Sequence, residues 1–139
     1  MTVRISSERA DVDFEVVHGF LHADAYWCRG VPRPVLEKAI ANSLCFSAFV
    51  DDRQIGFARV VTDRATFAYL CDVFVLPSAR GQGASRKLLE SIDKHPDLQG
   101  LRRFLLATAD AHGLYAQYGF VPLSRTERFM ERYRPDAYA

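Results

Sequence analysis

The sequence predicts a mixed α/β protein whose twisted, mostly antiparallel sheet carries helices on both faces. Residues 70–76 form an almost uninterrupted apolar run that is typical of a strand covered on both faces, and Pro77 ends this run. A glycine loop and a helix up to His95, with apolar residues at helical spacing, follow directly. Residues 44–50 and 54–62 are two strands joined by a short turn, which predicts an antiparallel hairpin. The full predicted order is βααβββαβαββ.

The first third of the chain is predicted to hold an edge strand and two helices. Alternating apolar and polar residues over residues 2–6 indicate the strand. Asp11 or Asp13 can cap a first helix that runs to about residue 24. Gly30 interrupts the chain, and two prolines then begin a second helix that ends near residue 43.

The last third is predicted to contain a strand, a helix and a closing pair of strands. The strand covers residues 101–108, and the helix covers residues 110–118 and ends at Gly119. Residues 120–123 and 127–133 are expected to pair with each other. With 139 residues and no repeat or linker, the chain is expected to form a single domain, residues 1–139.

Composition gives little reason to expect a nucleic acid or a membrane as partner. The net charge is only +1, and 49% apolar with 25% charged residues is ordinary for a globular protein. Without an apolar run of about 18 residues or a signal peptide, we expect a soluble, cytoplasmic protein. Three cysteines, an odd number at wide spacing, favour reduced thiols. His18 and His22 have metal-binding spacing but lack a third ligand, so no metal site is expected.

The glycine loop before residue 84 has the form of a phosphate-binding helix start, where free amides and the helix dipole favour an anion. A Walker A loop needs glycine five residues after Gly81, where the chain has Arg86. A dinucleotide-binding fingerprint also needs that glycine, and an acidic residue about 20 positions later, where Arg102 and Arg103 stand. Both of these interpretations fail.

The remaining pattern, V-x-P-x-x-R-G-x-G from Val75 to Gly83, resembles the acetyl-CoA pyrophosphate loop of the GNAT superfamily of N-acetyltransferases. Arg80 and Gly83 match that loop, and Ser85 stands where glycine or alanine is usual. Without the resemblance, the same glycines are explained by a simple strand-to-helix turn.

A second segment, residues 104–120, strengthens the resemblance. It is similar to the later strand and helix of the superfamily, which commonly end in L-Y-x-x-x-G-F, and Leu114, Tyr115, Gly119 and Phe120 match. Thr108 replaces an asparagine that is frequent seven residues before the tyrosine. Two motifs in the same order are more specific than either one alone.

The resemblance implies acetyl-CoA as co-substrate, no metal, and transfer of acetyl to a primary amine by direct attack in a ternary complex. The backbone of Val73, Phe74 and Val75 would bind pantetheine and the thioester, and Thr108 the pantetheine arm. Charge from Arg86 and Lys87 would help to hold the phosphates, or these side chains form the solvated face of the helix. The implied pyrophosphate loop consists of Arg80, Gly81, Gln82, Gly83, Ala84, Ser85 and Arg86.

Tyr115 is the predicted general acid. An ordinary phenol is protonated at neutral pH and can return a proton to the leaving thiolate. The alternative is a tyrosine that only packs against the sheet.

Asp72 is the predicted general base because it is the only charged residue in the central apolar strand. A buried carboxylate is energetically costly unless it is paired or takes part in a reaction. Asp72 therefore either accepts a proton, directly or through water, or is paired with Arg59 or with backbone donors. Asp110 and His112 are alternative bases, although Asp110 also suits a helix N-cap.

The predicted acceptor site is the loop of Tyr26, Trp27 and Arg29, where aromatic rings can bind a cationic amine and arginine a carboxylate. It is equally explained as a hydrophobic corner against the sheet. The acceptor is a small-molecule amine or a protein amino group, and exposed closing strands leave room for a homodimer. Two competing hypotheses are a non-catalytic CoA-binding regulatory module and a phosphate-ligand sensor unrelated to CoA.

Overall fold

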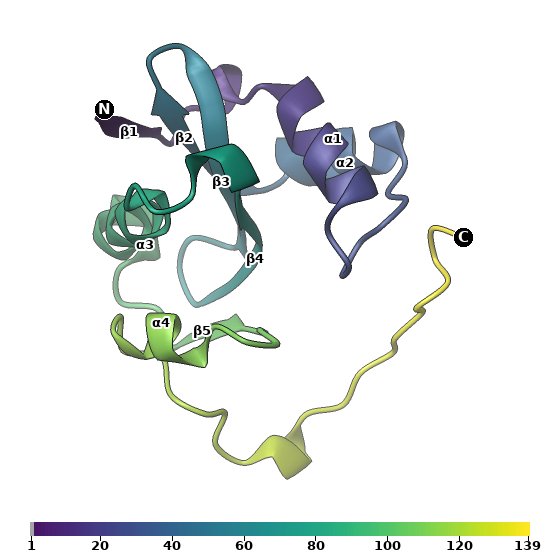
Figure 1. Cartoon of the computed structure of the whole chain (residues 1–139). Coiled ribbons are helices and arrows are strands. Elements are labelled where there is room, and N and C mark those ends of the chain that lie inside the picture. Colours follow the sequence, from purple (N-terminus) through teal and green to yellow (C-terminus); the bar gives the residue numbers. More distant parts are fainter. Residues whose placement is uncertain (1) are drawn as a thin grey trace.

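A five-stranded sheet in the order β1-β2-β3-β4-β5 forms the centre of the protein (Figure 1). The computed structural model describes residues 2–139. The strands are β1 (Val3–Ser6), β2 (Leu44–Val50), β3 (Arg53–Thr62), β4 (Phe67–Val75) and β5 (Arg103–Leu106), and the α-helices are α1 (Phe14–Ala23), α2 (Arg33–Ala41), α3 (Ala84–Lys94) and α4 (His112–Ala116). Short 3-10 turns η1 (Arg9–Asp11), η2 (Pro77–Ala79), η3 (Pro96–Leu98) and η4 (Thr126–Arg128) lie in the connections.

The strand pairing confirms a mixed but mostly antiparallel sheet. Strands β1 to β4 pair antiparallel in sequence order, and β5 then pairs parallel to β4. The β3–β4 register shifts between Phe57 and Arg59, which indicates a bulge in the central strand. The β2–β3 hairpin is confirmed, with β2 at its predicted bounds.

Helices cover both faces of the sheet, as predicted. Buried Ala84, Leu88 and Ile92 of α3 pack in one core cluster with Val60 and Leu70 of the sheet. On the opposite face, α1 and α2 form a second cluster with strands β2, β3 and β4, which includes Val17, Leu21, Leu36, Ile40, Cys45, Phe57 and Phe74.

The start of α1 is held as the sequence indicates. The Asp13 side chain accepts a hydrogen bond from the Val16 amide at 3.3 Å, which is the expected N-cap. Buried Gln54 accepts one from the Asp13 amide at 2.7 Å and donates one to the Gly56 carbonyl at 3.0 Å. This side chain therefore fixes α1 against strand β3.

The predicted closing strand pair is wrong. Within residues 2–139 no strand follows β5, and residues 121–139 are all exposed. Residues 120–123 and 127–133 have a strand-like pattern, but the chain turns away at η4, so neither segment meets a backbone partner. The sheet therefore ends at β5.

Three other boundaries also differ from the prediction. Strand β4 begins at Phe67 rather than Leu70, because it continues to pair with β3 back to the turn after Thr62. Strand β5 and helix α4 are shorter than predicted, and the N-cap position of α4 is Ala111, so Asp110 is not the cap. The Thr108 hydroxyl instead accepts a hydrogen bond from the Ala111 amide at 3.1 Å, which delays the start of α4.

Among residues 2–139, no helix combines the length and the apolar character that crossing a bilayer requires.

Candidate active site

Strands β4 and β5 separate at the centre of the molecule. Their parallel pairing stops at Leu70 and Leu106, whereas β4 continues to Val75. On this side of β4, the segment from Asp72 to Val75 therefore lies next to open space rather than next to a strand. The resemblance implied that the backbone of Val73 to Val75 binds a thioester arm, and the strand pairing leaves that backbone unpaired on this side.

The glycine loop presents free amides at the end of that opening. Gly81 and Gly83 have φ of +83° and +80°, values that favour glycine, and Gly83 is the N-cap of α3. The first helical hydrogen bond runs from Lys87 to the Gly83 carbonyl. Within the described chain, the amides of residues 81–86 donate to no acceptor. The loop can therefore bind a pyrophosphate.

Two adjoining cavities connect the loop to the central strand. The loop cavity, about 560 Å³, is lined by residues of the glycine loop, the end of β4 and α4. The strand cavity, about 390 Å³, is lined by the middle of β4, the end of β5 and the turn before α4. Both include Val73, Trp27, Asp110 and Tyr115 in their lining. A ligand that reaches from the loop to the strand passes these four side chains.

Tyr115 lies at the junction of the two cavities, only 8% exposed. Burial, and secondly the negative charge of Asp110, raise the pKa of the Tyr115 hydroxyl. The ring packs edge to face on Phe120, with 6.1 Å between centroids. Nothing in residues 2–139 forms a hydrogen bond with the hydroxyl, so this group is a protonated donor without a protein acceptor.

Asp72 sits in the bulge of β4 and uses both carboxylate oxygens. Its φ is +55°, which costs an ordinary residue roughly 1 to 2 kcal/mol. Arg59 Nε donates to one oxygen at 2.8 Å, and Trp27 Nε1 donates to the other at 2.9 Å. Arg59 also donates to the Ser43 hydroxyl at 3.0 Å. The geometry therefore agrees with the paired alternative for Asp72.

Two of the three residues of the predicted acceptor loop line the loop cavity and the strand cavity. Tyr26 and Trp27 line both of them and contact each other edge to face, with 5.1 Å between ring centroids. Arg29 is exposed and lines neither the loop cavity nor the strand cavity. The aromatic pair thus forms one wall at the point where the cavities meet.

The other predicted cofactor residues separate into two groups. Lys87 donates to the Val3 carbonyl at 2.9 Å, so it ties α3 to β1 and does not face the loop cavity. Gln82 lies in the loop but outside the lining, and Thr108 lines the strand cavity. His112 is exposed and lines no described cavity. The residues that do line the loop cavity are Val73, Phe74, Val75, Arg80, Gly81, Gly83, Ala84, Ser85 and Arg86.

The structure also shows the surroundings of His18 and of the Cys71 thiol. His18 Nε2 lies 3.0 Å from the Val31 carbonyl, and its ring stacks on Phe14. Cys71 lines the strand cavity, and burial raises the pKa of its thiol to about 12. A thiol this weakly acidic is a poor nucleophile at neutral pH.

Sequence reasoning missed several lining residues. Phe20 and Asp24, at the end of α1, line the loop cavity, and Phe20 stacks on Phe74 with 4.2 Å between centroids. Tyr69 and Cys71 line the strand cavity. No motif marks these positions, and the one available signal is that Phe20 follows Val17 by three residues, which places both on neighbouring parts of the helix surface.

Known proteins share this architecture. Residues 41–122 match the family model described as Acetyltransferase (GNAT) domain. A Gibberella zeae protein named "Putative acetyltransferase" is 29% identical over 135 residues, which cover 81% of this chain and 75% of that protein. A crystal structure from Xanthomonas campestris pv. campestris, described as belonging to the GNAT family, is 51% identical with a TM-score of 0.97 and covers 100% of this chain and 98% of that one. A Clostridium acetobutylicum structure with acetyl-CoA is 13% identical with a TM-score of 0.67, covers 95% of each chain and shows the fold alone.

Proposed function

Because the chain belongs to the GNAT acetyltransferase family, we propose that it transfers an acetyl group from acetyl-CoA to a primary amine by direct attack in a ternary complex. The observation that carries the proposal is the junction of the loop cavity and the strand cavity at Tyr115. The glycine loop, the open edge of β4 and the Tyr115 hydroxyl lie along these two adjoining cavities, and this arrangement supports the proposal. Acetyl-CoA is also the compound named with the Clostridium acetobutylicum structure.

The chain's own residues fit a pyrophosphate carrying an extended arm. The free amides of residues 81–86 and the guanidinium groups of Arg80 and Arg86 supply donors and positive charge at one end. Arg80 Nε also donates to the Val75 carbonyl at 3.2 Å, which links the loop to the end of β4. Acetyl-CoA, when bound, supplies the activated acetyl group. The open edge at Val73, Phe74 and Val75 orients its arm.

Tyr115 provides the proton that the reaction needs. As the amine nitrogen attacks the thioester carbonyl carbon, a C–N bond forms, the C–S bond breaks, and the sulfur takes the proton of the Tyr115 hydroxyl. The raised pKa of that hydroxyl keeps it protonated before the step. Asp110, which lines both cavities, accepts through solvent the proton that the amine nitrogen loses, and the same solvent then carries this proton to the Tyr115 phenolate, so both side chains return to their starting states.

In this proposal Asp72 is a positioning residue. Its two oxygens hold Arg59 and Trp27, and so fix the aromatic wall of Tyr26 and Trp27 beside the reacting centre. That wall favours a cationic amine before it is deprotonated. The strand cavity, about 390 Å³, has the size of ordinary small-ligand sites, and the acceptor in this proposal is the amine of a small molecule or of a protein side chain.

The proposal is tested by calorimetric titration with acetyl-CoA. The wild type should bind, and Gly83→Trp should abolish binding, because the new side chain fills the loop at the start of α3. Gly100→Trp is the matched control, since Gly100 also has a positive φ of +69° with open space but lines no described cavity. Failure of the folded wild type to bind contradicts the proposal.

A non-catalytic CoA-binding module is the second candidate, and the occupied carboxylate of Asp72 favours it. A screen of primary amines for release of free CoA thiol separates the two. Release with any amine supports the enzyme, whereas tight binding without release across small amines and lysine peptides supports the module.

A further inference from the structure

The strand cavity is lined by a group of aromatic side chains, Tyr26, Trp27, Tyr69 and Tyr115. Three of these rings are partly uncovered, since Tyr26 is 66%, Trp27 43% and Tyr69 36% exposed, whereas Tyr115 is buried. Ligand sites are commonly lined by aromatic side chains that a bound molecule covers. The three open rings therefore indicate where the apolar part of a ligand would lie.

The open rings belong to one side of the sheet, the side of α1 and α2. Tyr69 shares a face of β4 with Cys71, because side chains two residues apart in a strand point the same way. Cys71 pairs with Arg59, and Arg59 pairs with Cys45, which packs under α1 and α2. Trp27 follows α1 in the chain, and its hydrogen bond to Asp72 holds the indole against the same strand. The rings are therefore fixed before a ligand binds.

The charges at the strand cavity leave one carboxylate unpaired. Among the described residues that line it, two are acidic, Asp72 and Asp110, and none is an arginine, a lysine or a histidine. Arg59 neutralises Asp72 from 2.8 Å. The three ion pairs found within residues 2–139 do not include Asp110. The cavity therefore has one net negative charge, and a ligand with a single positive charge complements it.

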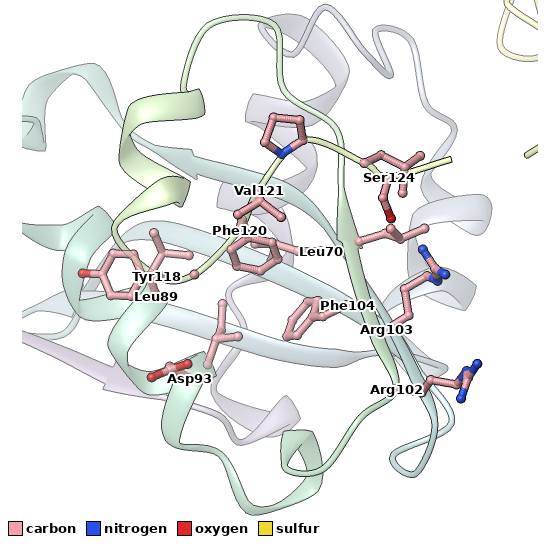
Figure 2. A pocket seen from close by; sticks show the side chains of 15 residues that line it. Leu70, Leu89, Asp93, Arg102, Arg103, Phe104, Tyr118, Phe120, Val121 and Ser124 are labelled. Atoms are coloured by element: carbon pink, nitrogen blue, oxygen red, sulfur yellow. The ribbon is translucent and has the colours of Figure 1, made fainter. Parts of the chain in front are cut away.

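The arginines that could bind a carboxylate of the acceptor line other cavities. Arg80 and Arg86 line the loop cavity, which is the site of the pyrophosphate in the proposed function. Arg102 and Arg103 line a third cavity, about 480 Å³, between α3, β5 and residues 118–124, and Figure 2 shows both at its rim. A carboxylate in the strand cavity would therefore lose water without gaining a charged partner. This disfavours amino acids as acceptors.

A second ammonium group would also lack a partner. Once Asp110 faces the first ammonium, only Asp72 is left in the lining, and both of its oxygens already accept hydrogen bonds from Arg59 and Trp27. Asp24 lines the loop cavity together with the arginines of that cavity, and not the strand cavity. A polyamine therefore gains no second ion pair here, whereas an aromatic ring gains contacts with three open rings.

We infer that the acceptor is an arylalkylamine, an amine joined by a short alkyl chain to an aromatic ring and without a carboxylate; this inference rests on the proposed function. The ammonium lies beside Asp110 and Tyr115, and the ring lies against Tyr26, Trp27 and Tyr69. After the ammonium has lost a proton, its nitrogen attacks the thioester carbonyl as in the proposed step. The products are the N-acetylated arylalkylamine and CoA, and the three open rings determine the specificity.

Fluorescence of Trp27 tests the ligand class, because it is the single tryptophan of the chain and lines the strand cavity. The protein is excited where tyrosine does not absorb and is titrated in the presence of CoA, which has no acetyl group to transfer. Phenethylamine should give a saturable change and bind about tenfold more tightly than phenylalanine, which adds only a carboxylate, or putrescine, which has a second ammonium instead of a ring. Equal or tighter binding of phenylalanine or putrescine overturns the inference, as does the absence of a saturable change with phenethylamine.

Two pairs of variants test the ring contacts and the charge separately. Tyr69→Leu should weaken phenethylamine binding by about fivefold through loss of a ring–ring contact. Phe67→Leu is its control, since Phe67 lies on the same face of β4 but lines neither cavity, and should leave the affinity unchanged. Asp110→Asn should weaken binding by about tenfold through loss of the charged partner, whereas Asp52→Asn in the exposed β2–β3 turn should not. Equal losses in a variant and its control contradict the inference.

Turnover separates this inference from the proposed function. With acetyl-CoA, the release of CoA thiol should have a higher kcat/KM for phenethylamine than for phenylalanine or putrescine. Binding with the expected preference but without thiol release supports the ligand class and contradicts acetyl transfer. A higher kcat/KM for phenylalanine or putrescine supports acetyl transfer and overturns the arylalkylamine as acceptor.

Discussion

Asp72 and Trp27, 45 positions apart, are joined by a hydrogen bond of 2.9 Å from the indole nitrogen to the carboxylate. Trp27 lies in the loop after α1, and Asp72 lies in the middle of the sheet. Since Arg59 holds the other oxygen, a single carboxylate connects the aromatic wall of Tyr26 and Trp27 with strands β3 and β4. The Asp72 carboxylate therefore holds Trp27, one wall of the strand cavity, against the sheet.

Asp72→Asn should lower the free energy of unfolding by about 3 kcal/mol, because it leaves the partly buried Arg59 without its charged partner. Urea unfolding measures the loss. Glu15→Gln is the control, since it breaks the exposed ion pair with Arg33 and should leave stability nearly unchanged. A shifted pH–rate profile at unchanged stability would instead make Asp72 the general base.

Tyr115→Phe should lower kcat by about 100-fold and leave the affinity for acetyl-CoA unchanged, because it removes the proton donor but keeps the ring. Steady-state kinetics and calorimetry measure the two quantities. Tyr118→Phe is the matched control three residues later, where the hydroxyl only donates to the Arg86 carbonyl at 3.4 Å. Equal losses in both variants would rule out a specific role for Tyr115.

The pKa of Tyr115 should fall in Asp110→Asn, because removal of a negative charge makes the phenolate less unfavourable. It should stay above the ordinary value, since burial is the larger cause. The neutral phenol stabilises the fold below the ordinary tyrosine pKa, and this contribution is lost as pH rises through the raised pKa. The measurement is the tyrosinate absorbance of each protein minus that of its Tyr115→Phe version. An unchanged titration would show that Asp110 does not act on Tyr115.

Substitutions of Arg86 and Lys87 should change different properties, acetyl-CoA binding for Arg86 and folding stability for Lys87. Arg86→Gln should weaken acetyl-CoA binding by about tenfold, through loss of a charged donor in the loop cavity. Lys87→Gln should leave that affinity unchanged and lower the free energy of unfolding by about 1 kcal/mol, because it loses the contact with the Val3 carbonyl. Calorimetry and urea unfolding of both variants give the four values, and the reverse assignment would contradict the structure.

The three thiols should react slowly with iodoacetamide at neutral pH in the folded protein. Burial is the main cause that raises the pKa of Cys28 and Cys71 to about 12 and that of Cys45 to about 11, so almost no thiolate is present. Mass spectrometry of native and urea-unfolded protein should show labelling that is fast only after unfolding. Rapid native labelling of Cys71 would point to an acyl-cysteine route in place of direct transfer.

Local patterns in the sequence were enough for much of the fold. The glycine loop, the hairpin and the central strand depend on neighbours in the chain, and the structure confirms them. The resemblance also led to the open edge at the end of β4, which the β4–β5 register confirms.

The sequence did not reveal features that depend on distant residues. The contact of Trp27 with Asp72 crosses 45 positions, and no periodicity records it. Residues 127–133 show the converse case, because they have a strand pattern but do not pair with the open outer edge of β5. A pattern predicts a tendency to pair, whereas the location of the partner depends on the path of the chain after α4.

The bulge at Asp72 has a consequence for genetic change in the central strand. Before it, Ala68 and Leu70 face α3, and after it Val73 and Val75 do, so Asp72 is one extra residue in an otherwise regular alternation. Deletion of Asp72 would leave all remaining side chains of β4 on their present faces. It would also make the hydrogen-bond ladder between β4 and β3 continuous. Deletion of a residue of β4 outside the bulge would move the side chains on one side of the deletion to the opposite face of the sheet. Position 72 is thus the place in this strand where a one-residue deletion keeps the alternation of side chains, and such a deletion would release Trp27 of the aromatic wall and leave Arg59 without its charged partner.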